Sequence, residues 1–364
     1  MTQSSSSLSK LALQKFKKNF WGVFSFGIIV IVGLISVFAY VLAPDNSQYA
    51  NQMHLAIHSK KPGFNVDMLV IPATNDQNQS FFNKLFFGER TFETEIPITQ
   101  FTIIKDHLTY TEYASDDLTG QVKTLDLSQY QKTRIPYVEN RTFVFGTDKY
   151  GRDLLSRILV GARISFFIGF IAVFISLVVG ILMGSLAGYF GGKVDALIMW
   201  IINVSWSIPT LLLVIAITLT LGKGFWQVFI AVGLTMWVEV ARVVRGQIIS
   251  VKEMQYVTAA RALGFSDFRI ITRHILPNIM APVIVISAAN FAAAILIESG
   301  LSFLGIGAQP PMASWGAMIK DHYNYIILGK PYLALIPGLC IMTLVMAFML
   351  MGNALRDALD VRAY

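Results

Sequence analysis

The sequence predicts an all-α polytopic membrane protein with six transmembrane helices and a small β-containing extracytoplasmic insertion. Of the 364 residues, 54% are hydrophobic and only 14% are charged, whereas about a quarter of the residues in soluble domains are charged. The apolar residues also gather in stretches long enough to cross a hydrocarbon layer of about 30 Å. These two observations exclude an ordinary soluble domain.

The distribution of charge indicates a membrane surface and argues against a nucleic-acid partner. Residues 45–146 hold 12 acidic and 9 basic residues, so the net charge of +7 arises from the rest of the chain. There the basic residues stand in short segments between apolar stretches, as they do on the cytoplasmic face of a membrane. The single cysteine and the scattered histidines lack the spacing of metal ligands, and no metal site is predicted.

Residues 1–20 are expected to be a cytoplasmic N-terminal segment, and residues 21–43 the first transmembrane helix. Lysines precede the apolar stretch, which places its beginning on the cytoplasmic side. A cleaved signal peptide is the competing interpretation, because Val41-Leu42-Ala43 has small-residue character. An apolar stretch longer than the roughly 7–15 residues of a signal core favours the uncleaved helix.

Residues 44–144 differ in composition and are predicted to form the extracytoplasmic insertion domain. Phe101–Thr111 is expected to be a strand, and the alternation of apolar and polar residues in Gln121–Leu127 predicts a second one. Asp116–Gly120 between them has the composition of a turn. After the insertion, Thr147 or Asp148 is expected to cap an amphipathic helix that lies in the membrane interface.

Residues 145–364 are predicted to form a second domain with the other five transmembrane helices. These helices are expected at 164–190, 196–221, 226–244, 279–304 and 332–352. Six spans would place both termini in the cytoplasm. Basic residues are concentrated in the loop 246–275 between the fourth and fifth spans, and this bias supports the predicted topology.

The stretch from Tyr256 to Asn278 predicts a bent helical projection at the membrane surface. Gly264 stands where a left-handed cap often ends a helix. Ser266 can cap a second short helix that begins at Asp267, and Pro277 is expected to break the chain before the fifth span. The first helix would have one short apolar face, made of Ala259, Ala260, Leu263 and Phe265. The projection suits docking of another protein, although an ordinary amphipathic loop helix would show the same pattern.

No catalytic set is found in the sequence, so the chain is not expected to be an enzyme. Gly222-Lys223 lacks the preceding glycine of a phosphate-binding loop, and any ATP would be handled by another chain. Glu298 is the main candidate for an acidic residue within a span. It is expected near the outer surface, where a structural role or an outer gate is favoured over a proton relay. Glu239 is expected to pair with Arg242 or Arg245.

Modest polar groups are candidates for lining a path through the membrane. Small residues also allow helices to pack closely, and this alternative stays open. A weakly polar path without fixed charges would suit varied substrates. The candidate lining residues are Asn203, Ser205 and Ser207 in the third span and Ser287 and Asn290 in the fifth.

The stretch from Tyr256 to Asn278 also resembles the cytoplasmic loop of permease subunits in binding-protein-dependent ABC importers. That loop has the form EAA, three residues, Gly, nine residues, Ile-x-Leu-Pro. Here Ala259-Ala260, Gly264 and Leu276-Pro277 fall at these spacings, whereas Thr258 replaces the usual Glu and His274 the usual Ile.

Two further stretches are similar to the C-type permease subunit of the dipeptide/oligopeptide branch of that family. FGTDKYGRDLLSRILVGARIS at 145–165 is similar to the opening of the permease domain, and ESGLSFLGIGAQPP at 298–311 to its later part. The resemblance covers residues 145–362 and the first span. It leaves the insertion without a counterpart.

The resemblance implies a type I ABC importer permease that forms half of a path for di- or oligopeptides in the bacterial inner membrane. The implied partners are a paralogous permease subunit, two ABC ATPase subunits or domains that hold ATP and Mg, an extracytoplasmic peptide-binding protein, and lipid. No cofactor is expected on this chain itself. The implied ATPase-coupling residues, mostly within the loop 256–273, are Tyr256, Thr258, Ala259, Ala260, Arg261, Gly264, Phe265, Asp267, Leu276 and Pro277.

Other functions stay open at this point. A permease for another solute, such as a nickel complex or a modified peptide, would have a similar sequence. An ion-coupled secondary transporter is disfavoured, because the spans show no inverted repeat and no midplane carboxylate. A membrane-anchored structural or sensor protein would account for the insertion but does not need five further spans.

Overall fold

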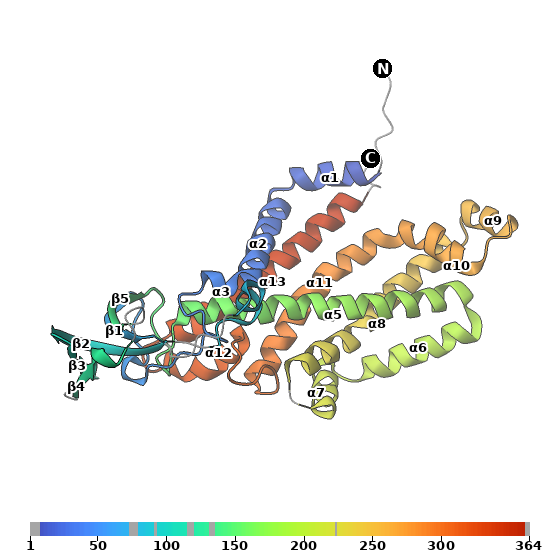
Figure 1. The fold of residues 1–364 in the computed structure, drawn as a ribbon. Helices are drawn as coiled ribbons and strands as arrows, with labels where there is room; N and C mark the ends of the chain where they lie inside the picture. The colour runs from blue at the N-terminus through green and yellow to red at the C-terminus, as the bar shows by residue number, and fades with distance from the viewer. Residues whose placement is uncertain are drawn as a thin grey trace, which may run out of the picture. The chain divides into compact units, whose positions relative to one another are not determined.

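A computed structural model describes residues 8–72, 79–90, 93–114, 120–130, 135–222 and 224–360. The chain divides into two compact units, which are described separately. The first unit comprises Met1–Val32, Ser165–Gln309 and Leu339–Tyr364, and the second comprises Gly33–Ile164 and Pro310–Gly338. Figure 1 labels the helices and strands in chain order.

The expected first span, residues 21–43, forms one long helix and one further turn. A polar helix, α1 (Leu8–Lys18), precedes α2 (Phe20–Val37), which is apolar along its whole length. The helix stops at Phe38, and a single further turn, α3 (Ala39–Leu42), follows. The expected span 21–43 is therefore divided near its end.

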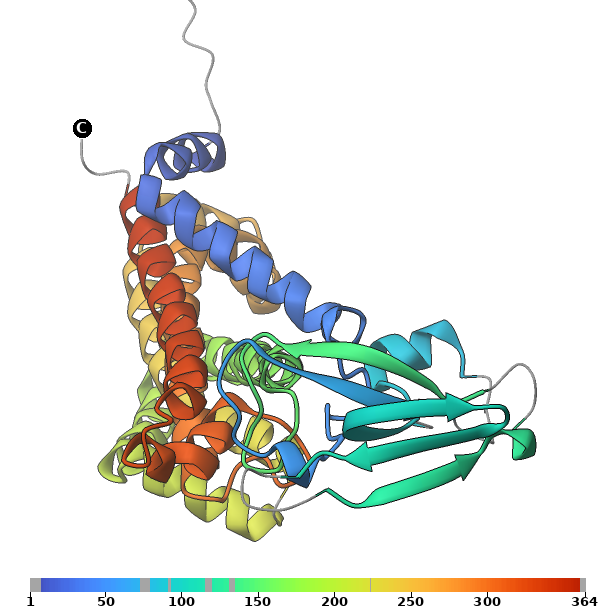
Figure 2. The ribbon, with the colours of Figure 1, turned by 90° about the vertical axis from the view of Figure 1, so that its left-hand side faces the viewer.

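The insertion contains one antiparallel sheet with the strand order β4-β3-β2-β1-β5 (Figure 2). Its strands are β1 (Phe64–Ile71), β2 (Thr94–Ile104), β3 (His107–Glu112), β4 (Val122–Asp126) and β5 (Tyr137–Phe143). Buried side chains such as Met68, Leu69, Ile98 and Leu108 form the core of this sheet. A short helix, α4 (Phe81–Phe87), lies between β1 and β2 in the chain.

The expectation of one strand over Phe101–Thr111 was wrong, because the chain turns back at Lys105 and Asp106. Lys105 has a φ of +53°, and His107 pairs with Ile104 across the hairpin. A two-residue turn with a left-handed residue suits the twist of antiparallel strands. The second expected strand is present as β4, whereas most of the expected turn at Asp116–Gly120 lies outside the described residues.

Glu95 on β2 joins three parts of the insertion through charged contacts. Its carboxylate accepts a hydrogen bond from Arg141 on β5 and lies 3.4 Å from Nε2 of His54. Burial acts to raise the pKa of Glu95, but the bonds from His54 and Arg141 outweigh it, and the pKa lies below its usual value. The carboxylate is therefore held in its charged form inside the insertion.

The stretch after the insertion leads into one long helix, α5 (Leu154–Phe190). Asp153 caps this helix, because its carboxylate accepts a hydrogen bond of 2.8 Å from the backbone of Ser156. The expected cap at Thr147 or Asp148 was therefore wrong. The helix also continues through the second expected span without the separate interfacial helix that the sequence suggested.

The third expected span is bent at Pro209. It consists of α6 (Gly192–Ser207) and α7 (Thr210–Leu221), whose axes differ by 95°. Proline has no backbone N–H and clashes with the preceding turn of a helix, which explains the break at this point. Within the described residues, five helices are long and apolar enough to cross a membrane, or six if this pair counts as one span.

The remaining helices are α8 (Phe225–Val251), α9 (Gln255–Ala262), α10 (Asp267–Arg269), α11 (Leu276–Phe303), α12 (Trp315–His322) and α13 (Tyr332–Leu359). Helices α5 and α8 pack closely because glycines on α5 face α8. A Cβ atom at Gly180 would lie 2.5 Å from Cβ of Val240, and one at Gly184 would lie 2.5 Å from the carbonyl oxygen of Ala241. Small residues four apart commonly permit such close contacts between transmembrane helices.

Candidate functional site

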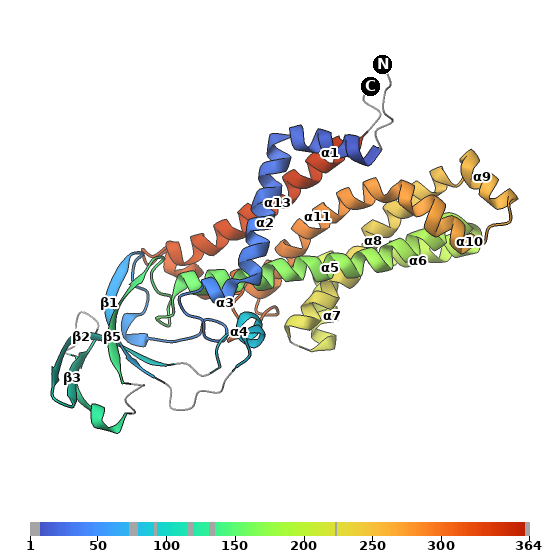
Figure 3. The ribbon, with the colours of Figure 1, turned by 45° about the horizontal axis from the view of Figure 1, so that its top comes forward.

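The principal candidate site is the elbow, defined as residues 255–275, which joins α8 to α11 in the first unit (Figures 1 and 3). Gly264 ends its first helix, α9, with a φ of +77°. Its N–H donates to the carbonyl of Arg261 at 3.0 Å, and the N–H of Phe265 donates to the carbonyl of Ala260 at 3.2 Å. This pair of bonds is a Schellman cap, in which a left-handed residue follows the C-cap residue of the helix, here Leu263.

The elbow packs on the ends of α5 and α8 through a buried apolar cluster. Val257, Ala260 and Ile270 are buried in this cluster together with Ile248 of α8. Phe265 is partly buried against it, whereas Ala259 and Leu263 are exposed. The predicted apolar face was therefore right for Ala260 and Phe265 and wrong for Ala259 and Leu263, because Val257 takes part in their place.

Polar contacts also hold the elbow in place. The Tyr189 hydroxyl at the end of α5 donates a hydrogen bond of 2.6 Å to the carboxylate of Asp267. The guanidinium of Arg261 lies 5.8 Å from the centre of the Tyr189 ring. Asn278 donates to the Tyr256 hydroxyl at 3.3 Å, which links α9 to the beginning of α11. These contacts position the two arms of the elbow relative to each other.

The two departures from the family pattern lie in different surroundings. Thr258 is exposed, and its hydroxyl lies 3.4 Å from the carbonyl of Met254. His274 is partly buried and stacks on the ring of Phe265, with 5.7 Å between the ring centres. His274 thus contributes to the packing of the elbow, whereas Thr258 belongs to its outer surface.

The sequence suggested a helix break at Pro277, but the helix continues through this residue. The short α10 passes through a π-helical segment, Ile270–Ile275, directly into α11, so that residues 267–303 form one helix. Pro277 lies in the first turn of α11, where a missing N–H is tolerated because the wider π-helical turn precedes it. Leu276 is partly buried beside it. The second arm of the elbow is thus continuous with the fifth expected span.

The outer surface of the elbow exposes large apolar side chains. Leu263 is 73% exposed and Phe268 is 78% exposed, on either side of the Gly264 turn. Exposed apolar residues of this size that stand together on a projection commonly mark a contact with another protein. The turn was predicted from the sequence, whereas Phe268 was not among the predicted site residues.

The candidate lining residues fall into two separate groups. Asn203, Ser205 and Ser207 lie in the last turns of α6, directly before the bend, whereas Ser287 and Asn290 lie on α11. A cavity of about 170 Å³ lies at the bend between α6 and α7. Of these five residues, only Ser205 lines it. Asn290 is buried, and its side-chain N–H has no hydrogen-bond partner within the described residues.

The two acidic candidates are placed differently from each other. Glu298 is buried near the end of α11 and accepts a hydrogen bond of 2.7 Å from the Ser302 hydroxyl. Glu239 was expected to pair with Arg242 or Arg245, and this expectation was wrong, because within the described residues both arginines contact other groups. Arg245 pairs instead with Asp195 of α6 at 2.6 Å, and the Arg242 guanidinium lies over the Trp206 ring at 3.6 Å.

Glu239 in fact lies near the middle of α8. Helix α8 continues to Val251, beyond the apolar stretch 226–244 that the sequence delimits.

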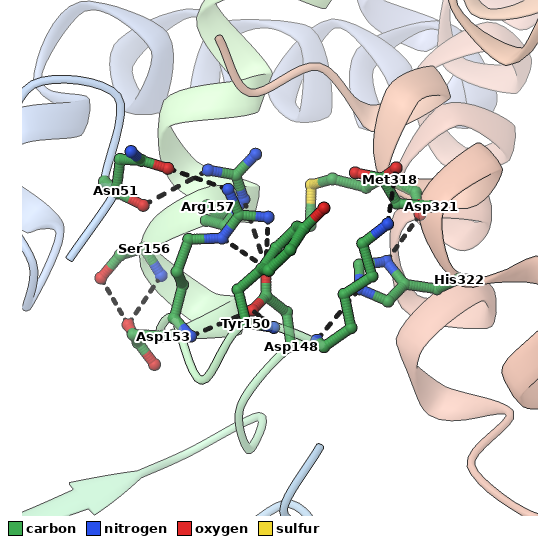
Figure 4. A network of polar contacts seen from close by, with 12 residues as sticks. Asn51, Asp148, Tyr150, Asp153, Ser156, Arg157, Met318, Asp321 and His322 are labelled. Atoms are coloured by element: carbon green, nitrogen blue, oxygen red, sulfur yellow. Dashed lines mark hydrogen bonds and ion pairs between the residues drawn. The ribbon is translucent and has the colours of Figure 1, made fainter. Parts of the chain in front are cut away.

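A cluster of buried charges in the second unit was not foreseen (Figure 4). It begins in the GTDKYGRD stretch, where the carboxylate of Asp148 accepts a hydrogen bond of 2.6 Å from Arg152 and lies 3.8 Å from Arg157. Both arginines and Asp148 are buried. Arg152 also donates to the side chain of Asn51, and Arg157 to the backbone of Tyr49. The cluster thus fastens the start of α5 to residues that follow the first span.

The same cluster extends to α12. Lys149 forms an ion pair of 3.0 Å with Asp321, and the backbone N–H of Lys149 approaches Nε2 of His322 at 3.4 Å. Nδ1 of His322 lies 2.7 Å from the carbonyl oxygen of Met318. Burial lowers the pKa of His322 below its usual value, although the bond to Met318 acts in the opposite direction. The imidazole is therefore neutral, with one nitrogen as donor and the other as acceptor.

Comparison with known proteins matches two parts of the chain to two protein families. Residues 180–362 match the family described as binding-protein-dependent transport system inner membrane component. Residues 7–62 match the family described as the N-terminal transmembrane domain of oligopeptide transport permease C. The sheet of the insertion lies between these two matched ranges.

Individual relatives agree with the family match. Over 216 residues, or 59% of this chain, the identity is 43% to the dipeptide transport system permease protein DppC of Bacillus subtilis, covering 68% of that protein. Over the same length it is 44% to the oligopeptide transport system permease protein OppC of Escherichia coli K12 and to the glutathione transport system permease protein GsiD of Escherichia coli O6, covering 71% of each.

One solved structure, an inward-facing form of the MetNI methionine ABC transporter, is similar with a TM-score of 0.46 and 16% identity. The similarity covers 56% of this chain and 96% of that chain.

The family match spans just over half of the residues, and the relatives are matched over more than two thirds of their length. The chain therefore belongs to the family of binding-protein-dependent transport system inner membrane components, as a multi-pass permease subunit of an ABC transporter in the inner membrane.

Proposed function

We propose that this chain is the permease subunit of an ATP-driven importer for di- and oligopeptides and forms half of the translocation pathway. The observation that carries the proposal is the elbow, which combines the spacing of the family's coupling loop with a Schellman cap and an exposed apolar tip. The relatives named for dipeptide and oligopeptide transport support peptides as the substrate class.

The partners follow from the same proposal. A paralogous permease would complete the pathway, two ABC ATPase subunits or domains would dock on the elbows and hold ATP and Mg, and a peptide-binding protein would deliver substrate from outside. The exposed Leu263 and Phe268 offer an apolar contact that an ATPase cleft could bury. With the elbow in the cytoplasm, both termini lie on that side as well, and residues 44–144 are extracytoplasmic.

The elbow would transmit movement because it is joined to the spans in two ways. Its first arm packs on α5 and α8, and its second arm continues into α11 as one helix. Closure of the ATPase pair on ATP would displace the elbow, tilt α11 and α8, and alternate the access of the pathway. The insertion, residues 44–144, would contact the binding protein or the partner permease on the outer side.

The substitution Gly264→Pro tests the coupling role. Proline requires a φ near −65°, whereas Gly264 has a φ of +77° and donates its N–H to Arg261. We expect ATP-dependent peptide uptake to be abolished while the chain stays in the membrane. Uptake of a dipeptide, a longer peptide and glutathione by the reconstituted complex would be measured, with membrane content checked by immunoblot.

Gly329→Pro is the matched control. Gly329 also has a positive φ, of +74°, an N–H bonded to a backbone carbonyl and open space around it, but it lies outside the elbow. Normal uptake by Gly264→Pro would remove the coupling role. Uptake that survives ATP depletion but fails with a collapsed ion gradient would instead support an ion-coupled transporter, and preferred uptake of glutathione would change the assigned substrate.

A further inference from the structure

Neither the sequence pattern nor the family match assigns a ligand to the cavity at the bend between α6 and α7. It measures about 170 Å³ and is lined by residues of α6, α7, α8 and α11, all of which belong to the first unit. The bend itself exists because Pro209 interrupts the helix. The polar part of the lining consists of Ser205, Thr210, Thr235 and Glu239.

Glu239 is the charged group of this cavity. It lies near the middle of α8, its side chain is exposed, and no hydrogen bond or ion pair to it is found in the described part of the chain. The arginines on the same helix are engaged elsewhere, Arg245 with Asp195 and Arg242 with Trp206 and Asn203. An acidic side chain on a membrane-spanning helix is costly, and such residues commonly lie on the path of a substrate or ion.

Two of the three hydroxyl groups in the lining, those of Ser205 and Thr235, present acceptors rather than donors to the cavity. The Ser205 hydroxyl donates to the carbonyl of Ile201 at 2.9 Å, and the Thr235 hydroxyl donates to the carbonyl of Val232 at 2.8 Å. Each hydroxyl proton is thus used within its own helix, while the oxygen lone pairs remain available. One carboxylate and two hydroxyl oxygens therefore offer a negatively charged set of acceptors.

We infer that this cavity is a transient site for the α-ammonium group of a peptide in transit. A primary ammonium carries one positive charge and three N–H donors, which match the carboxylate and the two hydroxyl oxygens. The rest of the lining is mostly apolar, including Leu213, Met236 and Ile297, and would contact the first side chain of the peptide. The inference rests on the proposed function and names the part of the substrate that this subunit recognises.

Arg242 gives the site a direction. Arg242 follows Glu239 by three residues on α8, and its guanidinium lies over the ring of Trp206 on α6. Its Nε has no hydrogen-bond partner within the described residues. Its positive charge lies beside Trp206, which lines the cavity, and favours the carboxylate end of a short peptide on that side. The bend would thus accept a zwitterion with the ammonium toward Glu239.

The test compares a peptide with a free N-terminus and the same peptide acetylated there. Both are offered to proteoliposomes that contain the whole importer with its binding protein and ATP, and the ratio of the two uptake rates is recorded for each variant. Because the same binding protein serves every variant, its own preference cancels when these ratios are compared. The variants are Glu239→Gln, Glu239→Asp and, as a matched control, Asp357→Asn, which removes an exposed carboxylate of α13.

Glu239→Gln is expected to lower the preference for the free amine by about tenfold, because a hydrogen bond to a charged group is lost. Glu239→Asp should keep most of the preference, and Asp357→Asn should keep all of it. If Glu239→Gln leaves the ratio of the two uptake rates unchanged, the inference is overturned. It is also overturned if Glu239→Gln and Glu239→Asp both reduce the uptake of the two peptides to the same extent. If the unaltered complex imports neither peptide, the proposed function itself fails, and the inference fails with it.

Discussion

The elbow and the buried charge cluster are both built from recognisable stretches of sequence, yet they use their side chains in opposite ways. The elbow places apolar side chains such as Phe268 on its surface. The charge cluster, made of Asp148, Lys149, Arg152, Arg157, Asp321 and His322, instead buries most of its ionised groups. This difference fits the proposed docking of another chain on the elbow, whereas the charge cluster joins segments of its own unit.

The largest effect is expected from Asp148→Ala in the charge cluster. This change leaves the buried guanidinium groups of Arg152 and Arg157 without their carboxylate, and breaking a buried ion pair from one side costs about 3–5 kcal/mol. We expect little folded protein in the membrane and a much lower unfolding temperature in detergent. Asp357→Asn is the control, and a normal unfolding temperature in Asp148→Ala would contradict a structural role for the cluster.

A smaller effect is expected from acidification through His322. Its pKa in the folded protein lies below the usual value because of burial, so the unfolded chain binds a proton first as the pH falls. The stability that the neutral imidazole provides is complete above a pH of about 6.5 and is lost as the pH falls through that value toward the folded pKa.

The measurement is the unfolding temperature at pH 7.5 and at pH 5.5. His322→Asn should reduce the difference between the two, and His58→Asn, which alters an exposed histidine, should not. Glu95 contributes in the same direction at lower pH, because its pKa is also lowered, and this part should remain in both variants. An identical pH dependence in His322→Asn and the unaltered protein would show that the imidazole is not the group responsible.

The smallest effect on stability is expected from Phe268→Ser at the tip of the elbow. The side chain is 78% exposed, and surface substitutions of this kind usually change the free energy of unfolding by less than about 0.5 kcal/mol. Co-purification of the ATPase partners should nevertheless fall, because an apolar contact is lost. Phe265→Ser should by contrast lower stability, since Phe265 packs on the buried cluster. If Phe268→Ser recovers as much ATPase as the unaltered protein does, the tip of the elbow does not take part in docking.

Much of this comparison could be predicted from the sequence, because local signals specify caps and apolar spans. Gly264 was correctly predicted to end a helix, since a left-handed cap depends on a few neighbouring residues. The pairing of Arg245 was not, because its partner Asp195 lies on another helix fifty residues away in the chain. Burial of Asp148 was also beyond reach, since its environment includes segments around Asn51 and His322.

The candidate lining residues show the same limit. Ser205 was named as a lining residue and does face the cavity, but Glu239 was assigned to an ion pair because the sequence places two arginines nearby. The continuity of the helix through Pro277 was missed for a related reason. A proline usually signals a boundary, and only the π-helical segment before it shows that the helix continues.

That continuity gives the molecule a lever. Residues 267–303 form a single helix of 37 residues, which at about 1.5 Å per residue is about 55 Å long. Rotation of such a rod by about 10° around one end would displace the other by roughly 10 Å. In the proposed mechanism, a small displacement at the elbow would therefore be amplified toward Glu298, near the far end of this helix.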